Sequence, residues 1–226
     1  MQLAPIYPIL YRLCRPMFPN CLWSGCESSP KIALTFDDGP HPQYTLPLLD
    51  VLERHQVQAN FFWLGHCVQR NPAVAKAVYK QGHYLGLHGY EHHNFPALTP
   101  EQLRSSLAAT RTAIARACQI DPTLLRDVRP PNGLFTPQVL HTLTQEQYRV
   151  VMWSVVPEDW LNPGIEVIME RIMQQVTNGS LIVLHDGHYG GQDVTQVTDR
   201  LIPKLVKLGY QFVTIEELWQ QQQGKN

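Results

Sequence analysis

The sequence predicts an α/β fold built on a parallel sheet, and three observations support this prediction. Apolar runs of four to six residues recur along the chain and are typical of buried strands. Longer amphipathic stretches with helical spacing separate these runs. Strands that alternate with helices form parallel sheets, because each parallel crossover needs a long connection. Two architectures fit the pattern, an open doubly wound sheet and a (β/α) barrel of seven or eight strands.

The predicted strands are bounded by polar, glycine or proline residues. They are Ile32–Phe36, Ala59–Leu64, Tyr84–Leu87, Leu124–Val128, Val150–Val155, Leu181–Leu184 and Tyr210–Val213. No glycine-rich phosphate-binding pattern follows the first of them, which argues against a dinucleotide-binding fold.

Start and stop signals locate several helices between these strands. Thr99, Pro100 and Gln102 have the pattern of a capping box with proline at the first helical position. Thr136 and Pro137 open a second helix in the same way. Three further helices are predicted over Pro163–Val176, over Val194–Leu208 and from Thr214 onward.

Length and composition favour one globular domain. The chain has 226 residues, of which 44% are hydrophobic and 16% charged. Residues 1–30 are rich in proline, cysteine and serine, so we expect an irregular N-terminal arm there. Residues 31–219 should form the domain, and residues 220–226 a fraying C-terminal tail.

Charge and hydropathy exclude several classes of protein. With 18 Lys and Arg against 19 Asp and Glu, the net charge is −1 and no basic stripe suggests a nucleic acid partner. No apolar run reaches the roughly 18 residues that a membrane span needs. The apolar start of the chain lacks the pattern of a signal peptide. We interpret it as a surface arm, with a membrane-touching segment as the alternative. The five cysteines fit reduced thiols better than a zinc pattern.

Polar residues stand at or shortly after the ends of five predicted strands. They are Asp37 and Asp38, His88, Arg129, Asp159 and His185. In a parallel barrel the carboxyl ends of all strands lie on one face, where active sites are built. We therefore expect these side chains to converge, although each motif by itself also fits a polar loop.

Asp38, His88 and His92 form a candidate metal site. Two histidines four residues apart can bind one ion, and His93 is the rival of His92. Two histidines and a carboxylate leave positions open for water and substrate, as in zinc hydrolases. Mononuclear iron oxygenases use the same ligand set, so the ligands do not decide the reaction.

The remaining polar residues suit proton transfer. Asp37 could move protons beside a metal-binding Asp38. His185 is a candidate general acid whose tautomer a carboxylate could hold, and Arg129 could pair with a buried carboxylate. Trp160 offers an apolar wall. Five histidines stand in no motif that suggests a function, namely His41, His55, His66, His83 and His141.

The motifs TFDDGP, H-x-x-x-H, R-P-P-x-G, Asp-Trp and L-H-D occur in that order. Over about Lys31 to Leu218 the chain thereby resembles the NodB-like polysaccharide deacetylases, carbohydrate esterase family four. The resemblance implies a single-domain, distorted (β/α) barrel of about seven parallel strands. It also implies a carbon–nitrogen hydrolase that deacetylates N-acetylglucosamine units of chitin-like or peptidoglycan polymers.

The resemblance assigns catalytic roles to the residues above. Asp37 would be the base, His185 the acid supported by Asp159, and Arg129 the group that holds Asp37 oriented and charged. Asp38, His88 and His92 would hold a divalent metal, with Zn²⁺ the first choice and Co²⁺ or another ion the alternative. A backbone N–H near Asn132 would share the developing oxyanion with the metal.

Substrate contacts are implied for Pro130, Asn132, Trp160 and Leu184. Of these, Trp160 and Leu184 would shape the pocket for the acetyl methyl group. The chain departs from the family pattern at three places that affect the substrate more than the reaction. Gly89 stands where Ser or Thr is usual, Asn132 where Tyr is common, and Val156 where Asp is common.

Two other functions stay open beside deacetylation of a glycan. One is hydrolysis of a small non-sugar amide by the same residues, and the other is an inactive glycan-binding module. The expected cellular location of the protein depends on which substrate it has. The missing signal pattern favours the cytoplasm by default, whereas a wall glycan as substrate would require the cell envelope.

Overall fold

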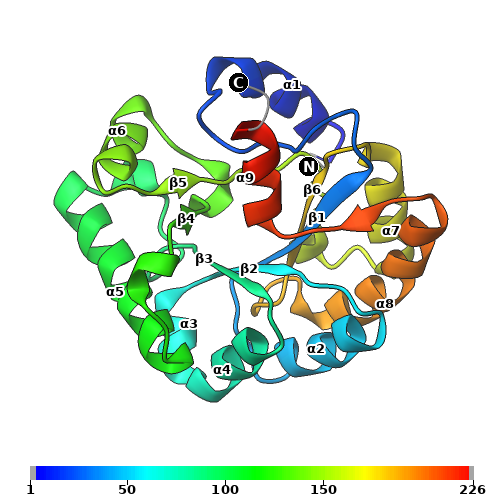
Figure 1. Cartoon of the computed structure of the whole chain (residues 1–226), viewed down its shortest axis with the longest axis horizontal. Coiled ribbons are helices and arrows are strands. Elements are labelled where there is room, and N and C mark those ends of the chain that lie inside the picture. Colours follow the sequence, from blue (N-terminus) through cyan, green and yellow to red (C-terminus); the bar gives the residue numbers. More distant parts are fainter. Residues whose placement is uncertain (1–3, 224–226) are drawn as a thin grey trace.

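Seven parallel strands curl into a partial barrel in the computed structural model, which describes residues 4–223. The strand order is β5-β4-β3-β2-β1-β6, and β7 pairs with the start of β1. Figure 1 shows the helices arranged around these strands. The curled sheet confirms the distorted (β/α) barrel rather than the open doubly wound sheet.

Each strand overlaps one of the predicted apolar runs. The strands are β1 (Lys31–Asp37), β2 (Asn60–Trp63), β3 (Tyr84–Leu87), β4 (Asp127–Val128), β5 (Arg149–Val150), β6 (Leu181–His185) and β7 (Gln211–Phe212). The run Val150–Val155 is a strand only at its first residue. Beyond it the partners change, because Val151 bridges to Leu22 and Val155 bridges to Ile182, so no continuous ladder forms.

The five helices predicted from the sequence are present as α5 to α9, and four further helices, α1 to α4, were not predicted. They are α1 (Tyr7–Met17), α2 (Thr45–Arg54), α3 (Gly65–Arg70), α4 (Pro72–Lys80), α5 (Pro100–Cys118), α6 (Pro137–Gln145), α7 (Ile165–Gln175), α8 (Gly191–Lys207) and α9 (Ile215–Gln223). Short 3₁₀ helices are η1 (Phe95–Ala97), η2 (Pro122–Leu124), η3 (Pro131–Gly133) and η4 (Asp159–Leu161). The capping box is confirmed, because the Thr99 hydroxyl accepts from the Gln102 N–H while the Gln102 side chain accepts from the Thr99 N–H.

Two apolar cores hold the barrel, one on each side of its wall. The larger lies between the strands and the outer helices. The smaller fills the interior, where Ala33, Phe62 and Leu181 meet Leu218 and Trp219 of α9. Figure 1 shows α9 lying across the centre of the ring. The interior is therefore packed at this end, and polar residues can collect at the other.

The N-terminal segment corrects the expectation of an irregular arm over residues 1–30. Tyr7–Met17 is helical, and Tyr11, Cys14 and Phe18 pack against the larger core. The helix is hard to predict from the sequence because its prolines are typical of loops. Pro8 lies in the first turn, where a missing N–H costs nothing, and Pro16 lies in the last. Residues 1–3 lie outside the described residues.

The C-terminal end also differs from the expected fraying tail. Residues 220–223 continue α9 as regular helix, while residues 224–226 lie outside the described residues. Among the helices between residues 4 and 223, none combines the length and the apolar character that crossing a bilayer requires.

Candidate active site

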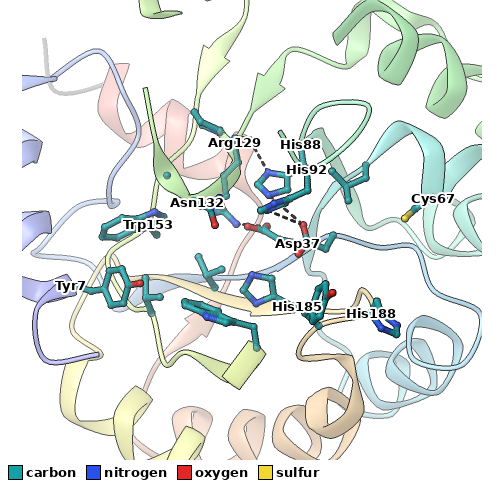
Figure 2. Close-up of a pocket in the computed structure, with 18 of the residues that line it drawn as sticks. Tyr7, Asp37, Cys67, His88, His92, Arg129, Asn132, Trp153, His185 and His188 are labelled. Atoms are coloured by element: carbon teal, nitrogen blue, oxygen red, sulfur yellow. Dashed lines mark hydrogen bonds and ion pairs between the residues drawn. The ribbon is translucent and has the colours of Figure 1, made fainter. Parts of the chain in front are cut away.

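A pocket of about 430 Å³ opens at the carboxyl ends of the strands. Asp37 and Asp38 at the end of β1, His88 after β3, Arg129 after β4 and His185 at the end of β6 all line it. His92, from the loop after β3, joins them. Figure 2 shows the side chains of Asp37, His88, His92, Arg129 and His185 gathered around one pocket. The structure thus brings together residues that lie up to 148 positions apart along the chain, from Asp37 to His185.

Asp38, His88 and His92 form a cluster with the spacing of ligands around one ion. Asp38 Oδ1 lies 3.5 Å from the Nε2 atoms of both His88 and His92. The three ligand atoms lie within 4.8 Å of one another. Two atoms bound to one tetrahedral zinc at 2.0–2.2 Å lie roughly 3.4 Å apart. His93 lies outside the cluster, where its ring faces Glu91 at 3.6 Å.

Backbone geometry and a hydrogen bond aim these ligands. Asp38 has φ 71°, in the left-handed region that few residues other than glycine adopt. His88 Nδ1 donates to the carbonyl of Arg129 at 2.7 Å, which leaves Nε2 for the cluster. Burial lowers the pKa of His88, and a neutral imidazole is the form that binds metal.

Asp37 is held by a fully buried arginine. Arg129 is 1% exposed, and its Nη1 donates to Asp37 Oδ1 at 2.6 Å. The same guanidinium donates to Thr35 Oγ1 at 2.8 Å and to the carbonyl of Met152 at 3.0 Å. Burial lowers the pKa of Arg129, and the charge of Asp37 opposes this shift. One carboxylate oxygen of Asp37 is thus fixed, while the residue lines the pocket.

His185 is tied to Asp159 by two hydrogen bonds. His185 Nδ1 lies 2.8 Å from Asp159 Oδ1, and its backbone N–H donates to Asp159 Oδ2 at 2.8 Å. Burial by itself lowers the pKa of His185, but the carboxylates of Asp159, Asp38 and Asp37 together outweigh it, and the pKa rises to about 10. His185 therefore presents a protonated ring to the pocket at neutral pH.

Three of the four residues expected to contact substrate line the pocket, and one does not. Pro130, Asn132 and Trp160 are on its surface. The expectation for Leu184 is wrong, because Leu184 is fully buried in the larger core. Successive side chains of a strand point to opposite faces, so Val183 lines the pocket together with His185.

Sequence reasoning missed an aromatic wall. Tyr7 from α1 meets the Trp153 ring edge to face, with ring centroids 5.3 Å apart. Both line the pocket, as do Tyr189, His188 and His66. No sequence signal pointed to Tyr7, because it lies far from every catalytic motif. Trp153 was hidden in an apolar run.

The three departures from the family pattern have defined surroundings in the structure. Gly89 has φ 89°, and the Ser106 hydroxyl from α5 accepts from the neighbouring Tyr90 N–H at 2.9 Å. Asn132 donates to Asn94 Oδ1 at 2.7 Å, which links two loops at the rim. Val156 lines the pocket as an apolar group.

Comparison with known proteins places this geometry among deacetylases. The model of the polysaccharide deacetylase family matches residues 24–151, more than half of the chain. A peptidoglycan-N-acetylglucosamine deacetylase from Bacillus cereus is 35% identical over 198 residues, which cover 87% of this chain and 91% of the relative. A chitooligosaccharide deacetylase from Bradyrhizobium sp. is 32% identical over 86% of this chain and 92% of the relative.

Solved structures are similar as well. The structure of a CE4 family pseudoenzyme from Bacillus anthracis matches with a TM-score of 0.80 and 28% identity. The match covers 87% of this chain and 67% of that one.

Proposed function

Because the chain belongs to the polysaccharide deacetylase family, we propose that it hydrolyses N-acetyl groups of N-acetylglucosamine-containing glycans. One observation carries this proposal. A single pocket holds three candidate metal ligands, a carboxylate fixed by a buried arginine, and a histidine fixed by a buried carboxylate. Metal-assisted amide hydrolysis needs these groups together.

Asp38, His88 and His92 would hold the divalent ion, and we propose zinc. Family four enzymes are generally metal-dependent. The residues present fit a cation, because the buried Oδ1 of Asp38 has no hydrogen-bond partner in the described chain. One carboxylate and two imidazoles also leave a coordination position open. Such an ion lowers the pKa of a bound water and polarises a carbonyl oxygen when it is present.

Asp37 and His185 would carry the protons. Asp37 accepts the proton of the attacking water, while Arg129 fixes the direction of its free oxygen. His185 donates a proton to the nitrogen of the leaving amine, and Asp159 holds its ring in place. The developing oxyanion is assigned to a backbone N–H of the turn at Asn132, on the pocket rim.

The acetyl group would lie against an apolar surface. Trp160 contacts the His185 ring edge to face, with centroids 5.1 Å apart. Val156 and Val183 line the same pocket. A methyl group packed here would keep the amide carbon within the pocket that Asp37 and His185 line.

The second candidate is an inactive glycan-binding module, because one similar structure is a pseudoenzyme. The intact cluster argues against it, since this chain keeps Asp37, Asp38, His88, His92 and His185 in contact with one pocket. A small non-sugar amide is the remaining alternative for the substrate. For the glycan substrate of a cell wall, we propose the cell envelope as the location.

Acetate release tests the proposal. The zinc- or cobalt-loaded protein is incubated with N-acetylglucosamine oligomers, with peptidoglycan and with a small N-acetylated amine. The proposal is supported if acetate is released from either glycan and if the variant Asp37→Asn no longer releases it. Release from the small amide but neither glycan would favour the alternative substrate. No release from any substrate, with metal bound, would favour the inactive module.

A further inference from the structure

The first helix carries an exposed apolar face. Large aliphatic side chains that are 40% to 69% exposed follow one another at helical spacing. They are Ile6, Ile9, Leu10, Leu13 and Met17, called here the α1 stripe. Exposed apolar residues scattered singly are ordinary, whereas a contiguous row marks a contact surface.

The rest of the helix has separate tasks. Tyr11, Cys14 and Phe18 face the larger core, and Tyr7 lines the pocket. At about 100° per residue, the α1 stripe lies roughly a third of a turn away from this inner face. Figure 1 shows α1 at the periphery of the ring, and Figure 2 shows Tyr7 entering the pocket from it. Packing of the domain therefore does not account for the stripe.

Charge around the stripe favours an anionic surface. None of residues 1–26 is acidic, while Arg12 and Arg15 lie within the helix. Arg15 pairs with Glu27, and Arg12 is exposed. An amphipathic helix with aliphatic side chains on one side and arginine beside them has the composition of helices that lie in the membrane interface.

The size of the stripe favours lipid over a protein partner. A standard protein–protein interface uses about 20–30 residues on each side. The stripe offers five side chains on one short helix. Binding to a lipid surface needs no complementary partner shape, and its strength grows with the apolar area inserted and with attraction to anionic lipids.

We propose that α1 rests on an anionic lipid surface through the α1 stripe and Arg12, without crossing the membrane. Because Tyr7 on the same helix lines the pocket, this contact would hold the pocket beside the lipid headgroups. If the proposed deacetylation is correct, its substrate would be glycan close to a membrane. The lipid contact itself does not depend on that activity.

Vesicle sedimentation of the full chain tests the proposal. Wild-type protein should sediment with phosphatidylglycerol–phosphatidylcholine vesicles and much less with phosphatidylcholine alone. The variant Ile9→Gln/Leu13→Gln/Met17→Gln should lower the partition coefficient about tenfold or more. A matched control, Leu124→Gln/Val206→Gln/Leu208→Gln, changes side chains of similar exposure elsewhere and should sediment like wild type. Arg12→Gln should weaken binding to anionic vesicles.

Several outcomes would overturn the proposal. Wild-type protein that stays in solution with anionic vesicles would do so, as would equal losses in the stripe and control variants. Equal binding to neutral and anionic vesicles would show that neither Arg12 nor the negative charge of the lipid contributes to binding. Light scattering that shows a dimer, split by the stripe variant, would assign the surface to a second copy of the chain. Acetate release from soluble oligomers should be unchanged in the stripe variant, which separates this test from that of the proposed function.

Discussion

Two arginine–aspartate pairs stand next to each other along β4, because Asp127 of one and Arg129 of the other are two residues apart and point to the same face of the sheet. The pairs differ in how many of their polar atoms have hydrogen-bond partners. Arg129 and Asp37 form the pair at the carboxyl ends of the strands, inside the pocket. Arg149 and Asp127 form the other, beside Trp219 of α9. Both aspartates are buried and both arginines lie over an aromatic ring.

The pair beside α9 is saturated, meaning that both carboxylate oxygens of Asp127 accept hydrogen bonds. The Nε and Nη2 atoms of Arg149 donate hydrogen bonds to the two carboxylate oxygens of Asp127, at 2.7 Å and 2.9 Å. Asp127 also accepts from the hydroxyl of Tyr84 and from the indole N–H of Trp219. Arg149 reaches Glu216 of α9 at 2.7 Å. These bonds attach α9 to the strands, which is a structural role.

The pair in the pocket is not saturated. Arg129 binds one oxygen of Asp37, and its buried Nε has no partner in the described chain. The buried Oδ1 atom of Asp38, which accepts no hydrogen bond from a group between residues 4 and 223, lies in the same pocket. Unpaired buried polar groups are costly, so the unpaired atoms of Asp38 and Arg129 beside the pocket indicate a site that awaits an ion, water and substrate. The Arg149–Asp127 pair, whose hydrogen bonds are complete, therefore has a structural role. The Arg129–Asp37 pair keeps a carboxylate oxygen that can take part in a reaction.

The largest effect expected from this comparison is on turnover at the pocket pair. Asp37→Asn keeps an oxygen for Arg129 but removes the proton acceptor. We expect kcat/KM for acetate release to fall by about 10²–10⁴, with metal content and folding retained. Turnover close to that of wild type would contradict the role of Asp37 as the base.

The matching change at the saturated pair should affect stability. Asp127→Asn removes the charge of a buried carboxylate, while the partly exposed Arg149 keeps its ion pair with Glu216. We therefore expect a loss of about 1.5–3 kcal/mol in the free energy of unfolding. Urea denaturation followed by circular dichroism measures it. The folded fraction should keep its kcat, and a selective loss of kcat would show that the two pairs are coupled.

Metal binding should distinguish two neighbouring histidines. His92→Ala removes a member of the cluster, whereas His93→Ala changes a residue that faces Glu91. We expect zinc affinity to fall roughly a hundredfold or more in the first variant, because even loss of a group that supports a ligand costs about 10–100-fold. Elemental analysis after dialysis provides the comparison. Equal metal content in the two variants would remove His92 from the site.

The smallest expected effect is a displaced pH profile. Burial lowers the pKa of His185, but Asp159, with Asp38 and Asp37, raises it to about 10, so the proton that His185 donates is present below this value and lost as pH rises through it. Asp159→Asn removes the carboxylate with the largest raising effect, so the alkaline limb of kcat/KM should move to lower pH with roughly tenfold lower activity at neutral pH. An unchanged alkaline limb would mean that another group sets it.

Much of this arrangement could be predicted from the sequence, because it depends on local patterns. Buried strands show as apolar runs, and catalytic residues stand where the runs end, as with Asp37 and His185. The separation of His88 and His92 by four residues also pointed to a shared ion, but the sequence could not separate His92 from His93. That choice depends on how the loop folds.

The errors arose where structure depends on distant partners or on strand phase. Leu184 and Val183 differ by one position and face opposite sides of the sheet. Helix α1 was missed because its prolines mimic a loop, and Tyr7 reaches the pocket only through the tertiary packing of that helix. The saturated Arg149 network carried no motif, since its members come from β3, β4, β5 and α9.

The central claim is that one divalent ion, shared by Asp38, His88 and His92, serves Asp37 and His185 in one reaction. Zinc titration of the chelator-treated protein tests it directly, with bound zinc and acetate release from N-acetylglucosamine oligomers measured on the same samples. The account predicts that activity is absent without metal and rises in step with binding to a plateau at one equivalent. Full acetate release from metal-free protein, or a bound equivalent of zinc that leaves activity unchanged, would contradict it.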